Sequence, residues 1–120
     1  WSEAEYHRAP TAFHARVARA FADWGIPTAD AIQYARENAP EAMVFASGGL
    51  RDGIDVAKCI ALGANLGGMA GPFLKTANES TEAVNQFIEE TVAQLRIAML
   101  CSGATTIADL QEIPLLKDSD

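Results

Sequence analysis

The sequence has 120 residues, of which 49% are hydrophobic and 21% are charged, and it carries a formal net charge of −7. A chain of this size can bury a core without disulfides or a structural metal, so the composition indicates a folded acidic protein rather than a disordered one. The nine Lys and Arg residues are scattered along the chain. This excludes a general nucleic-acid-binding protein, because neutralising phosphates requires clustered basic side chains.

Signals for compartment and processing are few. No run of 18 apolar residues and no signal-peptide pattern occurs, so neither a membrane span nor a secretory leader is predicted. Cys59 and Cys101 lie in apolar helical patterns without partners at metal-ligand spacing, which favours two buried structural thiols in a reducing, cytoplasmic compartment. Because the chain begins at Trp1 rather than at Met, we expect an upstream part of the protein.

Hydrophobic periodicity predicts two helices and a strand in the first part of the chain. Residues 11–24 repeat apolar side chains at steps of three and four, which predicts an amphipathic helix that ends at Gly25. Residues 28–38 form the next predicted helix, with Thr28 as its N-cap. The short and continuously apolar segment 42–46 is typical of a buried parallel strand.

Helices and strands are also predicted to alternate in the rest of the chain. A helix is predicted over residues 52–62, with Gly63 as its C-terminal cap, and a second strand over residues 66–69. Three more helices are predicted: a short one over 72–77, a long one that Ser80 starts and Gly103 ends, and a last one over 107–111. The tail, residues 115–120, is expected to be frayed.

This order of elements predicts an α/β fold. Two parallel strands joined by a helix make a βαβ unit, but two strands do not form a stable parallel sheet by themselves. The chain therefore either associates with other chains or is a piece of a larger barrel.

Two glycine-rich segments follow the predicted strands. The first glycine turn, residues 47–53, contains Gly48 and Gly49 and opens a helix, and the second glycine turn is residues 67–74. Glycines allow backbone N–H groups to approach an anion, and a helix N-terminus adds a positive dipole, so a phosphate suits both turns. Arg51 is placed to add a charge-assisted hydrogen bond.

The pairing of these turns makes the signal more specific. In (β/α)8 barrels a recurrent phosphate site is built by the loops after the seventh and eighth strands together with a short extra helix, which residues 72–77 fit. A single Gly-Gly pair after a strand is more often an ordinary tight turn. We therefore predict phosphate binding from the two turns together.

Five segments carry a likeness to a known family: Asp23–Thr28, Ala46–Lys58, Ala61–Ala64, Gly68–Lys75 and Gly103–Leu110. On these segments the chain resembles the C-terminal stretch of the type 2 isopentenyl-diphosphate isomerase family. The glycine turns alone would also suit flavin-dependent hydroxy-acid oxidases, whereas the Trp-Gly-Ile-Pro-Thr segment and the Gly-Ala-Thr-Thr-Ile-Ala-Asp-Leu segment favour the isomerases. The likeness covers nearly the whole chain in one order.

The resemblance implies an FMN-dependent enzyme that isomerises isopentenyl diphosphate to dimethylallyl diphosphate. It implies that residues 1–120 are the C-terminal part of one TIM (β/α)8 barrel domain and that Trp1 and Ser2 end the loop after the sixth strand. It also implies Mg²⁺ and NADPH, a soluble homo-oligomer without nucleic-acid or membrane partners, and catalytic and metal-binding residues upstream of this chain. The residues matched to the cofactor site are Gly48, Gly49, Leu50, Arg51, Ala70 and Gly71.

Two functional alternatives stay open. In the first alternative, the chain is part of an FMN-dependent 2-hydroxy-acid oxidoreductase barrel. In the second, it is a catalytically incomplete fragment that only associates with itself through exposed sheet edges. A catalytic His and Arg in the upstream sequence would favour the first alternative.

Other polar and aromatic residues are interpreted as surface or packing residues. His7 and His14 lack a third ligand and are expected at the surface rather than as a metal pair. Lys58 and Lys75 follow the two turns and are more simply explained as helix-surface lysines. The acidic pairs Glu79/Glu82 and Glu89/Glu90 are expected to face solvent, and Phe21 and Trp24 to pack their helix onto the barrel.

Overall fold

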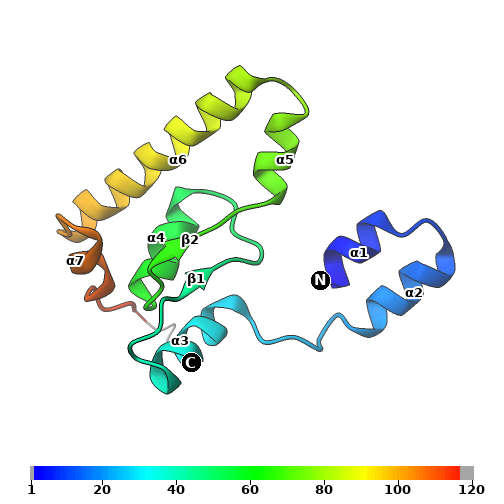
Figure 1. Ribbon diagram of the computed structural model, residues 1–120, viewed down its shortest axis with the longest axis horizontal. Coiled ribbons are helices and arrows are strands. Elements are labelled where there is room, and N and C mark those ends of the chain that lie inside the picture. Colours follow the sequence, from blue (N-terminus) through cyan, green and yellow to red (C-terminus); the bar gives the residue numbers. More distant parts are fainter. Residues whose placement is uncertain (1, 117–120) are drawn as a thin grey trace.

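A computed structural model describes residues 2–116 and shows seven helices and two short strands in that range (Figure 1). Trp1, for which a loop position is expected, and residues 117–120 of the tail expected to be frayed lie outside the described residues. The elements, in chain order, are α1 (Ser2–Arg8), α2 (Ala12–Ala20), α3 (Thr28–Asn38), β1 (Phe45–Ala46), α4 (Gly53–Ala61), β2 (Leu66–Gly67), α5 (Gly71–Ala77), α6 (Thr81–Ser102) and α7 (Ile107–Gln111).

The two strands pair in parallel, as the strand–helix–strand order predicts. Phe45 pairs with Leu66 and Ala46 pairs with Gly67. Both strands are shorter than the predicted ranges 42–46 and 66–69. Just before β1, the Val44 N–H donates to the Asn65 side chain at 2.9 Å, and the Val44 carbonyl accepts from the Asn65 N–H at 2.8 Å.

Only one face of this small sheet is covered. Ala46 is 4% exposed and belongs to the core, whereas Phe45 is 65% exposed and Leu66 is 51% exposed. Successive strand residues point to opposite faces, so the paired residues Phe45 and Leu66 share the uncovered face. The prediction of a strand buried on both faces is therefore wrong for residues 2–116, in which helices cover one side only.

Helix α4 lies between the sheet and α6 and carries much of the core. Its first residue, Gly53, approaches α6 so closely that an added Cβ would lie 2.1 Å from the Thr91 carbonyl oxygen. The Gly53 N–H also donates to Gln94 Oε1 at 2.8 Å, which fixes the two helices at this crossing. The buried side chains around α4 are small or medium in size: Ile32, Ala46, Leu50, Val56, Ala57, Cys59, Ile60, Ala64, Ala104 and Leu110.

Local capping explains where several helices begin and end. The Asp52 carboxylate accepts from the Ile54 and Asp55 N–H groups at the start of α4, and Ser80 Oγ accepts from the Ala83 N–H at the start of α6. Gly103 ends α6 with φ of 79°, a left-handed conformation that glycine adopts without strain. These boundaries agree with the sequence predictions to within about one residue.

The start of helix α7 is capped by two side chains. Thr106 and Asp109 form a capping box at α7, in which each side chain accepts from the backbone of the other. Hydrogen bonds from Thr105 and Thr106 lower the pKa of Asp109. The predicted range 107–111 is confirmed.

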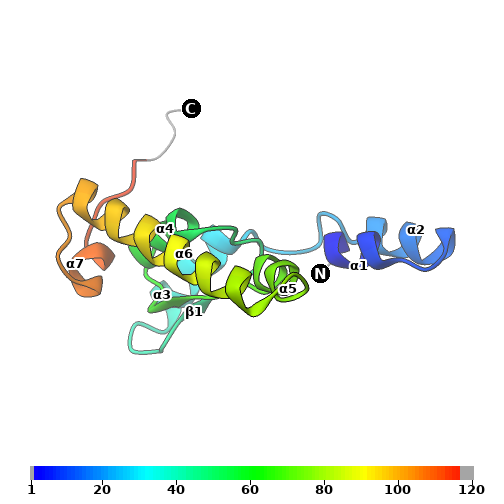
Figure 2. The same cartoon turned by 90° about the horizontal axis from the view of Figure 1, so that it is seen from above.

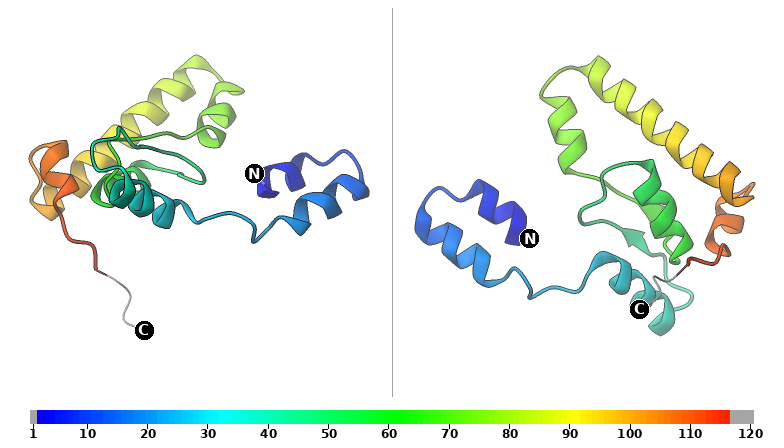
Figure 3. Two further views of the ribbon diagram at one scale, coloured as in Figure 1. Left: turned by 60° about the horizontal axis from the view of Figure 1, so that its bottom comes forward. Right: turned by 180° about the vertical axis from the view of Figure 1, so that it is seen from behind.

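The N-terminal region differs most from prediction. Helix α1 was not predicted, and α2 ends at Ala20 instead of Trp24. The two helices form a hairpin that stands apart from the rest of the chain in all views (Figures 2 and 3). Within the hairpin, the Arg19 guanidinium donates to the Tyr6 hydroxyl at 2.7 Å and lies 4.8 Å from the centre of its ring.

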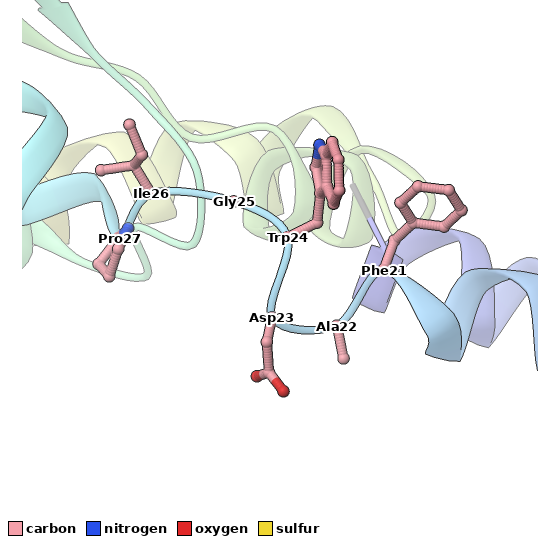
Figure 4. A pocket seen from close by; sticks show the side chains of 7 residues that line it. All are labelled: Phe21, Ala22, Asp23, Trp24, Gly25, Ile26 and Pro27. Atoms are coloured by element: carbon pink, nitrogen blue, oxygen red, sulfur yellow. The ribbon is translucent and has the colours of Figure 1, made fainter.

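The sequence predicts that Phe21 and Trp24 pack their helix onto the body of the protein, and this prediction is wrong. Trp24 is 81% exposed, and its ring meets the Phe21 ring edge-on at 5.8 Å between centroids (Figure 4). The backbone leaves the helix after Ala20 and turns, so these rings lie in the segment that joins the hairpin to α3. They border a cavity of about 730 Å³.

The long helix α6 has a partly uncovered apolar face. Leu95 and Met99 pack against the core, but Ile88 and Val92 are exposed, so only part of the apolar face of the helix is buried. Cys101, near its end, is also exposed, and the prediction of a buried thiol is wrong there.

The other cysteine agrees with prediction. Cys59 is buried in the core, and burial raises the pKa of its thiol. Among residues 2–116, none of the helices combines the length and the apolar character needed to cross a bilayer.

Candidate anion-binding site

The two glycine turns border one cavity of about 970 Å³. All six predicted site residues line it, although they come from two segments about twenty residues apart in sequence: Gly48, Gly49, Leu50, Arg51, Ala70 and Gly71. The helices α4 and α5 that follow the turns are both held by α6, which explains why the turns stay side by side. The predicted juxtaposition of the turns is confirmed, whereas the ligand they hold stays a prediction.

The first glycine turn has the backbone conformation of an anion-binding loop. Gly48 has φ of 98° and Gly49 has φ of 82°, values that residues with a Cβ rarely adopt. Within residues 2–116, the N–H groups of Gly49 and Leu50 donate to no other group. Two consecutive donors are therefore available to a ligand.

Leu50 contributes to the site through its backbone alone. Its side chain is 6% exposed and belongs to the core. An added Cβ on Gly67 would lie 3.2 Å from Leu50 Cδ2 and 3.0 Å from both γ-carbons of Val56. The buried leucine thus fixes the first glycine turn against the strand that leads into the second.

The N-terminus of α4 does not contribute as predicted. Asp52 accepts from the N–H groups of Ile54 and Asp55, and the N–H of Gly53 is bound to Gln94 Oε1. The first-turn donors of the helix are therefore used by the protein itself, and the cap is a carboxylate. An anion at the first glycine turn depends on the loop amides that precede this helix.

Arg51 is bound to a carboxylate rather than free. Its Nε donates to Asp55 Oδ2 at 2.9 Å, its Nη2 donates to Asp55 Oδ1 at 3.3 Å, and its backbone N–H donates to Asp55 Oδ2 at 3.1 Å. The hydrogen bond from Arg51 lowers the pKa of Asp55, and the same contact raises the pKa of Arg51. The Nη1 edge of the guanidinium has no partner in residues 2–116 and is the part that can meet an anion.

Thr28 has a role that differs from the predicted one. Pro27 occupies the N-cap position of α3, and Thr28 is the first helical residue without a side-chain cap bond to the helix. Its hydroxyl instead donates to the Gly48 carbonyl at 2.8 Å and lies 3.3 Å from the Ser47 carbonyl. The contact joins α3 to the first glycine turn.

Sequence reasoning missed Thr28 and Asp55 as site neighbours for different reasons. The spacing of Arg51 and Asp55, four residues apart across the start of a helix, is a signal that predicts an ion pair. The Thr28–Gly48 contact joins residues twenty apart, and no local pattern indicates it.

The second glycine turn contributes two further donors. The N–H groups of Ala70 and Gly71 donate to no group in the described chain. The predicted extra helix is present as α5, and Pro72 is its second residue instead of its first. The Phe73 ring meets the Phe87 ring edge-on at 4.9 Å, which fixes α5 against α6.

Residues from the N-terminal hairpin also reach this cavity. Ala4 and His7 of α1 line it, and His7 is exposed, as predicted for a surface histidine. Lys58 borders a neighbouring cavity of about 660 Å³ on α4 that also touches the first glycine turn. In residues 2–116 no three His, Cys, Asp or Glu side chains are grouped so that they would hold a metal ion.

Comparison with known proteins agrees with the resemblance found in the sequence. The profile of the FMN-dependent dehydrogenase family matches residues 19–116. The isopentenyl-diphosphate delta-isomerase of Rickettsia bellii (strain RML369-C) is 44% identical over 115 residues, which is 96% of this chain and 34% of that protein.

Two further relatives carry the same name. That of Nostoc sp. is 45% identical over 111 residues, covering 92% of this chain and 32% of the relative. That of Stutzerimonas stutzeri is 45% identical over 117 residues, covering 98% of this chain and 34% of the relative. The chain thus spans about a third of the length of the curated relatives it matches.

Proposed function

The chain belongs to the FMN-dependent dehydrogenase family, and on that premise we propose that it forms the flavin-phosphate site of an isopentenyl-diphosphate isomerase. In this proposal the chain is the C-terminal part of a (β/α)8 barrel, and its two strands are the last two of eight. The one-sided burial of its sheet supports this, since a barrel covers both faces of each strand.

The observation that carries the proposal is the cavity shared by the two glycine turns. It brings four unpartnered backbone N–H groups, those of Gly49, Leu50, Ala70 and Gly71, to one hollow. Converging N–H donors are the chemistry that binds a phosphate dianion.

The residues present fit the phosphate of FMN. Added Cβ atoms on Gly49 and Gly71 would meet nothing within 4 Å, so the backbone at both positions borders open space in which a ligand can approach. When bound, FMN supplies the reducible ring on which the chemistry depends. The residues of this chain would orient that ring only indirectly, by fixing the phosphate end of the cofactor.

The substrate assignment follows from the relatives, which are named isopentenyl-diphosphate delta-isomerases. We assign the chain the same reaction, the conversion of isopentenyl diphosphate to dimethylallyl diphosphate, in a homo-oligomer that requires Mg²⁺ and NADPH. The description of the family as FMN-dependent dehydrogenases favours a second candidate, an oxidoreductase. We propose 2-hydroxy acids as the substrates of that candidate. The two candidates differ in residues that precede this chain.

A chimera tests the proposal. The last third of the Stutzerimonas stutzeri relative is replaced by this chain, and the purified protein is assayed for bound FMN and for isomerisation, with the parent enzyme as reference. We expect a chimera that retains FMN and isomerises isopentenyl diphosphate. A folded chimera that loses FMN would contradict the proposal.

A third possibility, that the isolated chain only associates with itself, rests on the uncovered side of the sheet. Phe45 and Leu66 are exposed there as a pair, and unpaired strand edges favour association. Size-exclusion chromatography of the 120-residue chain distinguishes the cases, since a monomer at all concentrations argues against assembly through this sheet.

A further inference from the structure

Within residues 2–116, the contact between Thr28 and Gly48 has no counterpart at the second glycine turn. Thr28 begins α3, lies twenty residues before the glycine, and places its hydroxyl 2.8 Å from the Gly48 carbonyl oxygen. The same hydroxyl lies 3.3 Å from the Ser47 carbonyl oxygen. One side chain therefore meets two consecutive carbonyls of the first glycine turn.

The Gly48 carbonyl and the Gly49 N–H belong to one planar peptide, so the contact at the carbonyl also sets the direction of the N–H. The described chain has no cis peptide bonds. In a trans peptide the carbonyl of one residue and the N–H of the next point in opposite directions. By holding the Gly48 carbonyl, Thr28 turns the Gly49 N–H away from α3, and that N–H is one of the four unpartnered donors.

Nearby geometry limits other arrangements of this turn. An added Cβ on Gly48 would lie 3.0 Å from Thr28 Oγ1, so the hydroxyl occupies the space beside the glycine. At the far end of the turn, Asp55 accepts from the Arg51 N–H at 3.1 Å. The peptides of Gly49 and Leu50 lie between these two fixed points.

We propose that Thr28 is a positioning residue for the anion site: its hydroxyl sets the orientation of the Gly48–Gly49 peptide, so that the Gly49 N–H is directed to a phosphate. This inference rests on the proposed function. Thr28 lines the same cavity, but its hydroxyl donates to the Gly48 carbonyl, so it acts on the ligand through the backbone of the turn.

The test compares Thr28 variants of the chimera with the Stutzerimonas stutzeri relative, using FMN and riboflavin, which lacks the phosphate. Thr28→Val removes the hydroxyl and keeps nearly the same side-chain shape. Thr28→Ala also removes the hydroxyl and introduces a residue that favours helices, whereas Thr28→Ser retains the hydroxyl. Thr91→Val is the matched control, because Thr91 Oγ1 also donates to a backbone carbonyl at 2.8 Å but lies in α6.

We expect Thr28→Val and Thr28→Ala to weaken FMN binding by roughly fivefold to tenfold and to leave riboflavin binding unchanged. A loss of this size corresponds to the typical contribution of one hydrogen bond. Thr28→Ser and Thr91→Val should bind FMN within about twofold of the unsubstituted chimera. The ratio of FMN to riboflavin affinity is the informative readout, because a merely structural loss lowers both.

Two results would overturn the inference. One is a folded Thr28→Ala chimera with the FMN affinity of the unsubstituted chimera, and the other is an equal loss of FMN and riboflavin affinity in both hydroxyl-free variants. An unsubstituted chimera that folds but binds neither FMN nor inorganic phosphate would instead contradict the proposed function, so the two failures are distinguishable.

Discussion

The two glycine turns look alike in sequence, yet their glycines serve different physical purposes. In the first turn, Gly48 and Gly49 adopt left-handed backbone conformations. In the second, no glycine has positive φ, and Gly67 lies so close to the side chains of Val56 and Leu50 that an added Cβ would crowd them. A glycine-rich pattern after a strand thus indicates either an unusual backbone conformation or a close approach, and only the structure separates them.

The turns also differ in how they are held. Thr28 and Asp55 bind the two ends of the first turn through its backbone. The second turn passes into α5, which is held through the packing of Phe73 on Phe87. One turn is fixed by hydrogen bonds and the other by side-chain packing, although both present the same kind of free N–H group.

The largest effect is expected where the first glycine turn meets α6. In Gly53→Ala the new methyl would lie 2.1 Å from the Thr91 carbonyl oxygen, so α4 and α6 must separate. We expect the free energy of unfolding to fall by about 3 kcal/mol or more, measured by urea denaturation. Gly25→Ala, where nothing lies within 4 Å of the added carbon, is the control, and equal loss in both variants would rule out close packing as the cause.

A smaller loss is expected at the strand that leads into the second turn. Gly67→Ala places a methyl 3.0 Å from both γ-carbons of Val56, whose side chain can shift by a few tenths of an ångström. The expected loss is about 1–3 kcal/mol. In Gly67→Ala/Val56→Ala the loss should be less than the sum of the single losses, and strictly additive values would contradict a steric origin.

The contrast between the turns predicts different outcomes for the same substitution at their cavity-lining glycines. Gly49→Ala forces a residue with a Cβ into positive φ and should cost about 1 kcal/mol, although the space is open. Gly71→Ala also enters open space but has no such strain, and should change stability by less than about 0.5 kcal/mol. Chemical denaturation of both variants checks the difference, and a larger loss for Gly71→Ala would reverse the comparison.

The smallest effect is expected from the ion pair at the end of the first turn. The Arg51 guanidinium lowers the pKa of Asp55, so the pair stabilises the folded state above the ordinary pKa of an aspartate. That contribution is lost as the pH falls through the lowered folded-state pKa. Wild type and Asp55→Asn should differ slightly in unfolding free energy at neutral pH and converge in acid, and a difference that grows in acid would have the wrong sign.

Local sequence patterns predict much of the part after residue 50. Helix caps bind backbone groups within a few residues of themselves, so they can be predicted from the sequence. Examples are the N-caps Asp52, Ser80 and Thr106 and the C-terminal glycine Gly103. The site residues of the two glycine turns also follow from short motifs. Their convergence on one cavity was predicted from the barrel pattern and is found in the structure.

Long-range contacts are what the sequence does not reveal. Arg36 donates to the carbonyl oxygens of Gly63 and Ala42 and to Asn65 Oδ1, fixing α3 to the loop before β2. Nothing in the helical pattern around Arg36 predicts these partners, just as nothing near Thr28 predicts Gly48. Exposure is equally non-local, because the hydrophobic character of Trp24 does not reveal that it lies in a connecting segment outside the core.

The most direct test of the account is a titration of the ¹⁵N-labelled chain with inorganic phosphate, followed through the amide signals of the two turns. We predict that the signals of Gly49, Leu50, Ala70 and Gly71 shift together and fit one dissociation constant, since these donors border one cavity. A response from one turn only, or separate dissociation constants for the two turns, would contradict a shared anion site.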